Sequence, residues 1–600
     1  MNSLRNIAII AHVDHGKSTL VDALLRQSET NLGKVEAGEL IMDSNELERE
    51  RGITIFSKNA AVIYKGTKIN IIDTPGHADF GGEVERVLNM ADGSLLLVDA
   101  QDGPMPQTRF VLKKAFEAKH KVIVVINKID KPNARVEFVH EKIIELFMDL
   151  GATDDQLNFP VIYAAGKLGL AGAEPNLANM TDIVPLFNAI VEHIPAPIVA
   201  DGPLQMMVVS IGYDNYQGRI AIGRVHRGIL KNGAQIAHIS REGIKKNCKI
   251  TSLTTYSGLA RIPAEEVGAG DIAAVAGVPD VNIGDTISDA EQAEALTPIA
   301  IEKPTVKMIF SVNNSPFSGQ EGTYCTSRNL RDRLFKELDN DVALRVEDTD
   351  SPDEFAISGR GELHLSILIE KMRREGYEFQ VSKPEVIFKE EGKEILEPVE
   401  DAWIEVPDEY SGMVIQKMAL RKGELKNMKV ENGITYFHFF IPTRGLIGFR
   451  NEFLLETKGM GVINSLYSGY FPRISGLETN PHGSLIAYET GVTTAYALLK
   501  SQERGVMFVE PGERVYEGQV VGKNAKEDDL VVNVCKSKHL NNFRAKAEAV
   551  TDDLVAKRVL SLEQALEYIG GDELLEVTPK NIRLRKRVLQ NNLRKKADED

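Results

Sequence analysis

A short apolar run that leads into a glycine-lysine-serine turn constrains this chain more than any other feature. Residues 7–11 read Ile-Ala-Ile-Ile-Ala and predict a buried strand, and residues 19–26 predict a helix after the turn. The turn nearly matches the pattern G-x-x-x-x-G-K-[ST], with Ala11 at the position of the first glycine. Backbone N–H groups and the N-terminus of a helix attract phosphate oxygens, so we expect a nucleotide site here.

The turn supplies most of the predicted phosphate contacts. Gly16 lets the backbone approach the phosphates, Lys17 would reach the β- and γ-phosphates, and the Ser18 hydroxyl would coordinate Mg²⁺. Asp14 suits either a monovalent cation or a cap of the following helix. An ordinary strand-to-helix turn is the alternative, because a short motif alone is not specific. The predicted nucleotide-binding residues of the turn are Asp14, His15, Gly16, Lys17, Ser18 and Thr19.

A second motif completes a predicted magnesium site. Asp73-Thr74-Pro75-Gly76-His77 follows an apolar strand at residues 69–72. A carboxylate at a strand end is placed to hold the metal through water, and the Gly76 N–H can reach the γ-phosphate. Thr54 lies in a charged segment with weak periodicity and supplies a second hydroxyl. The sequence therefore predicts Mg²⁺ at Ser18, Thr54 and Asp73.

A third motif predicts guanine rather than adenine. Asn127-Lys128-Ile129-Asp130 closes the apolar strand at residues 122–126. The Asp130 carboxylate can accept both N–H groups of a guanine edge, and adenine offers no such pair. Asn127 and Lys128 are predicted to bind the nucleotide as well. The three motifs occur in the order that one GTP site requires.

Composition limits the other functions of the chain. Three widely spaced cysteines form no metal or disulfide pattern, which favours a reducing cytoplasm. We expect no membrane segment, because no apolar run approaches the ~20 residues that span a bilayer. The net charge of −16 argues globally against nucleic acid, but salt screens charges beyond ~8 Å, so local basic patches still count. Residues 580–596 form one such patch, for which a solvated tail is the alternative.

The chain is predicted to be a multidomain α/β and β protein, because 600 residues exceed one core. Strands alternate with helices first, glycine-punctuated strands follow, and split βαβ patterns come next. The predicted domains are a P-loop GTPase domain at 1–197, a β-barrel at 203–290, a ferredoxin-like unit at 303–390, a second α/β unit at 396–475 and a distinct C-terminal domain at 476–600.

Three stretches of the first domain resemble the signatures of translational GTPases, the elongation-factor family. They are residues 11–18, 49–54 and 73–77. Small signalling GTPases usually carry glutamine where this chain has His77. We expect His77 to position the attacking water, and the resemblance implies that Val13 and Ile53 flank it as an apolar gate.

Along its whole length the chain also resembles the BipA/TypA family of ribosome-associated GTPases. Residues 42–45, 103–108 and 443–450 carry this closer match. The resemblance implies two ferredoxin-like α/β units followed by a C-terminal domain of the BipA type. Translational GTPases usually have Ser-Ala in the loop beside the guanine, whereas this chain has Ala164-Ala165-Gly166-Lys167 in that place. We expect the Ala165 N–H to reach the guanine O6.

The resemblance implies a ribosomal partner, with contacts to ribosomal RNA, to ribosomal proteins and, as a further candidate, to transfer RNA. We expect a cytoplasmic monomer whose GTPase activity the ribosome stimulates, acting in large-subunit assembly and in growth under cold or stress. Two alternatives stay open: a LepA-like or EF-G-like elongation factor, and an assembly chaperone in which GTP hydrolysis only times release. The RNA-binding candidates are Lys536, Lys538, Arg544 and Lys546.

Overall fold

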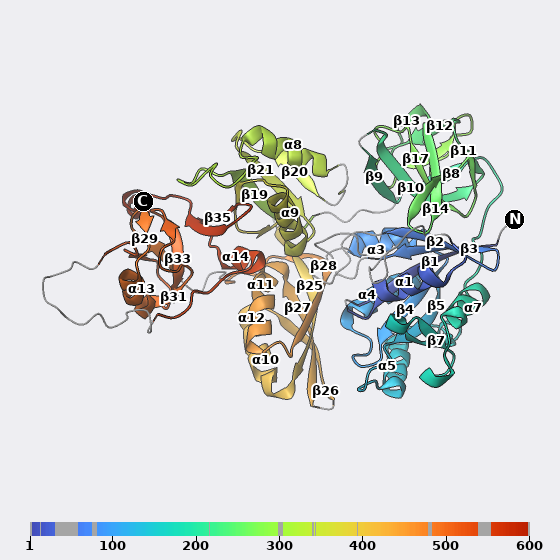
Figure 1. Cartoon of the computed structure of the whole chain (residues 1–600), viewed down its shortest axis with the longest axis horizontal. Coiled ribbons are helices and arrows are strands. Elements are labelled where there is room, and N and C mark those ends of the chain that lie inside the picture. The colour runs from blue at the N-terminus through green and yellow to red at the C-terminus, as the bar shows by residue number, and fades with distance from the viewer. Residues whose placement is uncertain are drawn as a thin grey trace, which may run out of the picture. The chain divides into compact units, whose positions relative to one another are not determined.

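The computed structural model divides into two compact units, Met1–Glu302 and Lys303–Asp600 (Figure 1). It describes residues 3–12, 14–30, 58–74, 81–214, 216–297, 304–338, 341, 344–392, 394–431, 433–477, 483–537 and 554–597. Several predicted site residues lie outside the described residues: Val13, Ile53, Thr54, Gly76, His77, Lys538, Arg544 and Lys546. Across the described part of the chain, no helix is long and apolar enough to cross a membrane.

The first domain is the predicted doubly wound α/β fold. Its seven-stranded sheet has the order β2-β3-β1-β4-β5-β6-β7, with parallel pairing from β3 to β6 and antiparallel edge strands. The strands are β1 (Leu4–Ala11), β2 (Asn59–Tyr64), β3 (Thr67–Asp73), β4 (Gly93–Asp99), β5 (Lys121–Asn127), β6 (Val161–Ala165) and β7 (Leu170–Gly172). Since parallel strands bury both faces, β4 and β5 in the middle of the sheet are nearly continuous apolar runs.

Helices cover both faces of this sheet. One apolar core includes side chains of α1 and α7, and the other includes side chains of α3, α4 and α5. The helices are α1 (Lys17–Gln27), α3 (Gly81–Leu88), α4 (Pro106–Glu117), α5 (Val136–Asp149), α6 (Asp154–Leu157) and α7 (Val184–His193). The arrangement brings the loops after β1, β3, β4, β5 and β6 to one edge of the sheet, where ligands bind in such folds.

The second domain is a β-barrel, as its glycine-punctuated sequence predicts. The described residues between 204 and 289 contain strands and turns but no helix. The strands are β8 (Gln205–Met207), β9 (Ser210–Asp214), β10 (Gly218–Arg227), β11 (Ile229–Lys231), β12 (Gln235–Ile239), β13 (Lys245–Lys249), β14 (Ser252–Ser257), β15 (Ala260–Pro263), β16 (Glu266–Gly268), β17 (Ile272–Ala276) and β18 (Thr286–Asp289).

A polar network joins the first two domains into one unit. Asp92 accepts a hydrogen bond of 2.9 Å from the Asn6 amide and pairs with Arg224 of the barrel at 2.8 Å. Lys68 pairs with Asp271 of the barrel at 2.8 Å. Burial raises the pKa of Asp92 even though Arg224 opposes this shift. Because removal of one partner would leave a buried group unsatisfied, the network fixes how the two domains pack.

The first ferredoxin-like unit has the strand order β20-β21-β19-β22. Its elements are β19 (Val306–Val312), α8 (Ser327–Glu337), β20 (Arg345–Asp348), β21 (Glu354–Gly359), α9 (Glu362–Arg374) and β22 (Phe379–Val381). His364 is buried on α9, and its Nε2 lies 2.5 Å from the Asp341 carboxylate. This buried pairing indicates a packing role for His364.

The second ferredoxin-like unit has the equivalent strand order, β26-β27-β25-β28. It contains β25 (Glu394–Pro407), α10 (Ser411–Leu420), β26 (Glu424–Glu431), β27 (Ile434–Pro442), α11 (Thr443–Leu446), α12 (Phe449–Glu456) and β28 (Val462–Pro472), and the short β24 (Lys389–Glu391) extends its sheet. Arg444 pairs at 2.5 Å with the fully buried Glu397 and donates to the Ile474 carbonyl. Arg444 therefore holds a turn in place.

The described C-terminal region combines small strands with three helices, the last of which is α15 (Asn591–Ala597). The strands are β29 (Ser484–Ala487), β30 (Gly491–Val492), β31 (Gly505–Met507), β32 (Arg514–Val515), β33 (Gln519–Asn524), β34 (Leu530–Val532), β35 (Glu573–Val577) and β36 (Ile582–Lys586). Ser561 caps α14 (Leu562–Tyr568) and forms a capping box with Gln564. The strand pattern alone does not predict α13 (Ala495–Ser501), a short helix that Thr494 caps.

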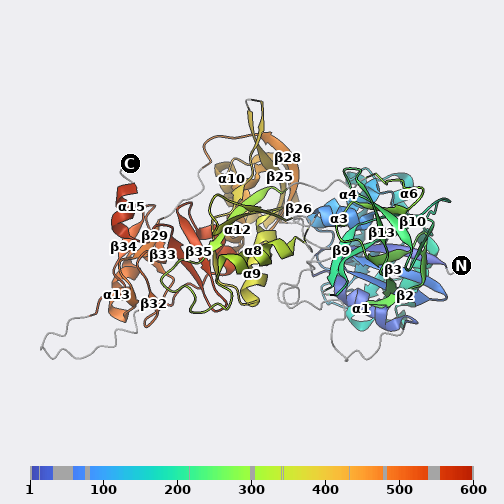
Figure 2. The same cartoon turned by 90° about the horizontal axis from the view of Figure 1, so that it is seen from above.

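The C-terminal region also completes the sheet of the first ferredoxin-like unit. β35 pairs with β22 in antiparallel register, with Phe379 opposite Val577. In Figure 2, β29, β33 and β35 follow one another toward α9, as the continuous sheet order from β22 through β35, β36 and β33 to β29 requires. Side chains from both segments share one apolar core. A sheet that is continuous in space thus links two segments that lie far apart in the sequence.

Candidate GTP site

The loop after β1 places a glycine where no other residue fits. Gly16 has φ +91° and stands just before α1. A Cβ on Gly16 would lie 2.5 Å from Nδ2 of Asn127. No side chain caps the N-terminus of α1, so the alternative role of Asp14 as a helix cap is not found. The turn after β1 therefore packs closely against the loop that carries Asn127, and this contact holds the main-chain N–H groups of the turn in place.

Lys17 lies between this loop and the end of β3. Its Nζ is 3.0 Å from Oδ1 of Asp73 and also donates to the main-chain carbonyl of Thr74. The Thr74 hydroxyl donates to the carbonyl of Ile9 at 2.6 Å, which fixes the end of β3 against β1. Lys17, Asp73 and Thr74 are all buried. The Lys17 ammonium can exchange the Asp73 carboxylate for a phosphate oxygen when a nucleotide binds at this edge.

Asn127 joins three loops of the site. Its Nδ2 donates to the carbonyl of His15 at 2.9 Å, and its Oδ1 accepts from the N–H of Gly166 at 2.9 Å. Asn127 is almost completely buried, so neither bond is replaced easily by water. The side chain thus connects the phosphate loop, the end of β5 and the loop after β6.

Lys128 reinforces the same connection. Its Nζ lies 2.7 Å from Oδ2 of Asp99 and donates to the main-chain carbonyl of Asp14. Burial raises the pKa of Asp99, but the hydrogen bonds from Lys128 and from the Gln101 N–H lower it below its usual value overall. Sequence reasoning missed Asp99, although its position at the end of β4 places it on the same edge as the other motifs.

His15 takes part through its backbone. Its side chain is 1% exposed, and its Nδ1 lies 3.4 Å from the Leu97 carbonyl. Burial, together with the nearby His12 ring at 5.2 Å, lowers the pKa of His15 to about 3. The imidazole is therefore neutral near pH 7 and adds no charge beside the phosphates.

The remaining predicted contacts lie along the same edge. Ser18 and Thr19 begin α1 and are partly buried, whereas Asp130 is exposed. Ala165 is fully buried at the end of β6, next to the Gly166 that binds Asn127. The Ile129 N–H donates to the Ala164 carbonyl at 3.3 Å, which brings the segments that carry Asp130 and Ala165 side by side.

The described residues fit a magnesium ion that is coordinated by oxygen. The Ser18 hydroxyl and the buried Asp73 carboxylate are hard donors of the kind that Mg²⁺ prefers. No group of three or more His, Cys, Asp or Glu side chains that could hold a metal is found in the described parts of the chain. A magnesium ion here would thus combine a hydroxyl and a single carboxylate with phosphate and water ligands, which is usual for this metal.

Family models match the chain from end to end. In chain order they are the elongation factor Tu GTP-binding domain (residues 2–196), elongation factor Tu domain 2 (218–288), elongation factor G domain III (323–383), the elongation factor G C-terminus (394–473) and the TypA/BipA C-terminal domain (482–591). The first match covers every described residue of the site.

Close relatives share the whole length of the chain. A large ribosomal subunit assembly factor BipA of Bacillus subtilis is 50% identical over 599 residues, which cover 99% of this chain and 98% of the relative. The protein of the same name from Salmonella typhimurium is 50% identical over 602 residues, with coverage of 100% and 99%. A putative chloroplastic elongation factor TypA-like protein of Arabidopsis thaliana is 51% identical over 587 residues, with coverage of 97% and 86%.

A solved structure supports the architecture. The crystal structure of a Thermus thermophilus protein, ttk003000868, matches with a TM-score of 0.55. Its 18% identity extends over 79% of this chain and 98% of that protein, so the likeness concerns the fold alone. The phosphate loop, the guanine motif and the near-complete coverage of the relatives lead to one conclusion: this chain is a GTPase that belongs to the TypA/BipA family of translational GTPases.

Proposed function

We propose that this GTPase acts on the ribosome and takes part in assembly of the large ribosomal subunit. One observation carries the proposal: 50% identity over almost the full length to proteins named large ribosomal subunit assembly factor. The similarity includes residues 482–591, the TypA/BipA C-terminal domain, which the elongation factor models do not cover. This domain favours assembly over the elongation-factor alternative. In the chaperone alternative, hydrolysis only times release from the subunit.

GTP would bind along the edge formed by the loops after β1, β3, β5 and β6. Lys17 would exchange Asp73 for the β- and γ-phosphates, and the main-chain N–H groups after Gly16 would bind phosphate oxygens. Asp130 would accept the guanine N–H groups while Asn127 keeps the two loops in register. Mg²⁺, when bound, neutralises charge on the β- and γ-phosphate oxygens. We assign the ion to Ser18, Asp73 and Thr54.

His77 is the residue that we propose to position the attacking water, with Val13 and Ile53 as its gate. A water held in line with the γ-phosphorus lowers the entropic barrier to hydrolysis, and this requires geometry more than a strong base. Contact with the ribosome would bring the His77 imidazole in toward the γ-phosphate. We therefore expect slow GTP turnover when no ribosome is present. The proposal draws on the family resemblance of the motif at residues 73–77.

The proposed RNA contact is the basic segment that carries Lys536, Lys538, Arg544 and Lys546. Cationic side chains that neutralise phosphates release counterions and so bind RNA in a salt-dependent way. We further propose a monomer in the cytoplasm that serves growth under cold or stress, with ribosomal RNA, ribosomal proteins and transfer RNA as contacts. The free thiols of Cys248, Cys325 and Cys535 suit a reducing compartment.

The test compares GTP turnover of the purified chain alone, with 70S ribosomes, and with isolated large and small subunits. Stimulation by ribosomes or by the large subunit is expected. In cells that lack the chain, sucrose gradients should show large-subunit precursors, and polypeptide synthesis on mature ribosomes should keep its normal rate. Normal subunit profiles combined with slowed elongation would overturn the assembly role and favour the elongation-factor alternative.

A further inference from the structure

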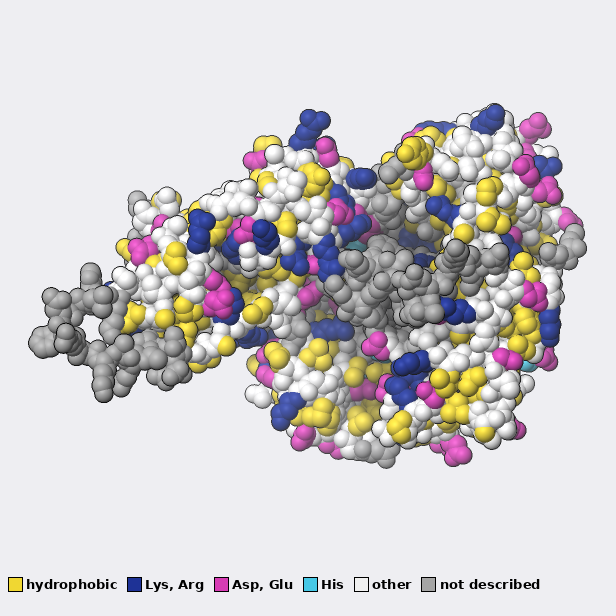
Figure 3. Space-filling view, in the orientation of Figure 1, with side chains coloured by type: hydrophobic (Ala, Val, Ile, Leu, Met, Phe, Trp, Pro, Cys, Tyr) yellow, Lys and Arg dark blue, Asp and Glu magenta, His cyan; other side chains and the backbone are white. Residues whose placement is uncertain are grey.

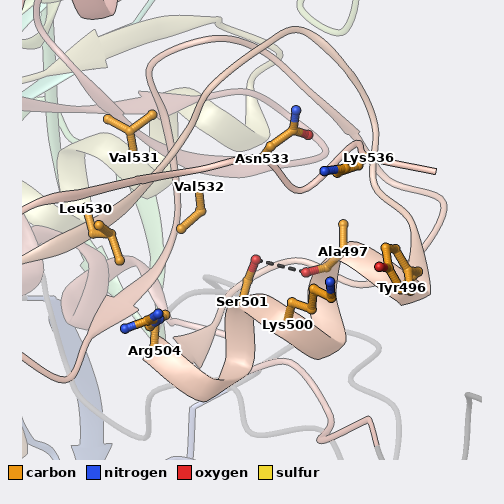
Figure 4. Close-up of a pocket in the computed structure, with 10 residues that line it drawn as sticks. All are labelled: Tyr496, Ala497, Lys500, Ser501, Arg504, Leu530, Val531, Val532, Asn533 and Lys536. Carbon is orange, nitrogen blue, oxygen red and sulfur yellow. Dashed lines mark hydrogen bonds between the residues drawn. The ribbon is translucent and has the colours of Figure 1, made fainter. Parts of the chain in front are cut away.

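A pocket of about 380 Å³ opens in the C-terminal region between α13 and the segment that starts with β34 (Figure 4). Its volume lies within the range of about 300–1,000 Å³ that small-molecule sites span. Figure 4 shows the helix with its following turn along one side, and the strand with its following residues along the other. The side chains that define its character are Tyr496, Lys500, Arg504, Leu530, Val532 and Lys536.

The pocket is basic in a chain that is acidic overall. Lys500, Arg504 and Lys536 contribute three cations to the lining, and the lining contains no acidic side chain. The chain carries a net charge of −16, and on the face in Figure 3 basic and acidic side chains are interspersed. Some cations elsewhere are neutralised, as Lys586 is by three carboxylates. Within the described residues, no ion pair neutralises the three cations of the pocket.

The wall between these cations is apolar and partly aromatic. Leu530 and Val532 project from β34 toward α13, and the Tyr496 ring lies at one end of the pocket. The Lys500 ammonium is 4.7 Å from the centre of that ring, so a cation and an aromatic face are held together. Apolar and aromatic side chains receive the face of a nucleic acid base, and neighbouring cations receive its phosphate.

One hydrogen bond joins the two walls, and two more hold the wall that contains Asn533 in shape. Thr494 caps α13 through the Ala497 N–H, and its hydroxyl also donates to the carbonyl of Lys536 at 2.7 Å. The Asn533 side chain accepts from the Cys535 N–H at 3.0 Å and donates to Glu489 at 2.9 Å. A site whose walls are held in this way loses little conformational entropy when a ligand binds.

We propose that this pocket binds one phosphorylated nucleotide. Its base lies against Leu530 and Val532, with the Arg504 guanidinium at its edge, and Lys500 and Lys536 bind its phosphate. The nucleotide comes either from an unpaired position of an RNA strand or from the free nucleotide pool. The inference rests on the proposed ribosomal function for the origin of the RNA strand. It does not involve the GTP site.

The experiment measures binding of a fluorescent, random-sequence RNA hexamer to the intact chain saturated with GDP, in the absence of ribosomes. Lys500→Gln, Arg504→Gln and Lys536→Gln should each weaken binding at least three-fold. Each lost phosphate contact should also lower the log–log salt slope by about 0.7. Lys526→Gln, which removes an exposed cation outside the lining, is the matched control and should leave affinity and slope unchanged. An abasic hexamer of the same charge should bind at least three-fold more weakly, because it lacks the bases that use the apolar wall.

Competition with the four nucleoside 5′-monophosphates identifies the source. Displacement of the hexamer by submillimolar monophosphate would assign the pocket to free nucleotides. The absence of displacement at 10 mM monophosphate would assign it to RNA. Both outcomes support a pocket that binds one base together with its phosphate. Equal affinities for the three pocket variants and Lys526→Gln, or equal affinities for the hexamer and its abasic form, would overturn the proposal. Because no ribosome is present, such a failure leaves the proposed assembly function unaffected, and ribosome-stimulated GTPase assays test that function separately.

Discussion

The side-chain amide of Asn127 donates a hydrogen bond of 2.9 Å to the main-chain carbonyl of His15. The two residues are 112 positions apart in the sequence, and the bond ties the guanine motif directly to the phosphate loop. A single buried side chain therefore connects the two motifs. The loop after β1 and the end of β5 are thus held together by a bond that neither motif reveals alone.

Gly16→Ala should abolish GTP binding because two effects combine. The new Cβ would lie 2.5 Å from Nδ2 of Asn127, and alanine is strained at φ +91°. Gly66→Ala is a suitable control. Gly66 has φ +73°, but a Cβ added there would meet no atom within 4 Å. This variant therefore measures the effect of backbone strain without a steric clash. We expect Gly66→Ala to lower stability by about 1 kcal/mol and to keep nucleotide affinity. Equal nucleotide affinities for the two variants in a titration would contradict the close contact.

Asp130→Asn should weaken GTP binding and shift preference toward xanthosine nucleotides. The substitution turns an acceptor into a donor, which suits the 2-oxo group of xanthine instead of the guanine amino group. Because the guanine N–H groups would lose their acceptor on binding, we expect GTP affinity to fall by at least two orders of magnitude. Competition between GTP and XTP measures this directly, with the exposed Asp102→Asn as a control. Unchanged GTP affinity would remove Asp130 from the guanine site.

His120 should make the chain less stable on acidification. Burial lowers the pKa of this imidazole to about 4, below the ordinary value of about 6.5 expected when unfolded. Between these values the unfolded state binds more protons, so the free energy of unfolding falls as pH drops from 6.5 to 4, by at most about 1.4 kcal/mol per pH unit.

His120→Gln should therefore reduce the difference in thermal midpoint between pH 7 and pH 5. His193→Gln, at an exposed histidine, is the control and should retain the difference of the unmodified chain. If His120→Gln and the unmodified chain lost the same stability between these two pH values, His120 would not be the group that takes up the proton.

His77→Ala should leave GTP affinity near normal and remove ribosome-stimulated turnover. A residue that positions water acts on the transition state more than on the bound substrate, so kcat falls while affinity is retained. General catalytic groups of this kind contribute roughly 10²–10⁴-fold. Single-turnover hydrolysis with and without ribosomes is the measurement. Stimulated rates within about five-fold of the unmodified chain, well below the range expected of such groups, would exclude His77 from this role.

The GTP-binding edge is predictable from the sequence because each motif there is contiguous and directly follows an apolar strand. Parallel strands bring their carboxyl ends together, so the strand pattern alone is enough to place Lys17, Asp73 and Asn127 at one edge. Asp99 was missed because a lone aspartate at a strand end has no local signature. Its contact with Lys128 arises only when the loops after β4 and β5 fold against each other.

Pairing between distant segments was beyond sequence reasoning. The pattern of residues 303–390 indicates a complete ferredoxin-like unit, but nothing in it shows that the edge strand β22 pairs with β35. An edge strand with unsatisfied N–H and C=O groups needs a partner, and any strand of suitable register can supply one. Choice among such partners depends on packing across the whole unit, which local periodicity does not encode.

The shared core predicts that the two segments unfold together. Leu566 on α14 is completely buried in the core that also contains Leu365 and Met372 of α9. Leu566→Ala should therefore cost about 2–5 kcal/mol, because it leaves a cavity between two helices that are far apart in sequence. Leu420→Ala, at a leucine that is 71% exposed, is the control and should cost less than about 0.5 kcal/mol.

Hydrogen exchange locates where that stability is lost. If the continuous sheet behaves as one cooperative unit, Leu566→Ala should speed exchange at the amides of β22 and α9 as much as at those of β35 and β36, since subglobal unfolding follows shared cores and strand pairing. Faster exchange confined to residues 562–586, with β22 and α9 still protected, would show that the ferredoxin-like unit is stable without its C-terminal partner. Comparable increases in exchange rate at all four elements would establish that the TypA/BipA-type C-terminal region is a structural part of that unit rather than a separate appendage.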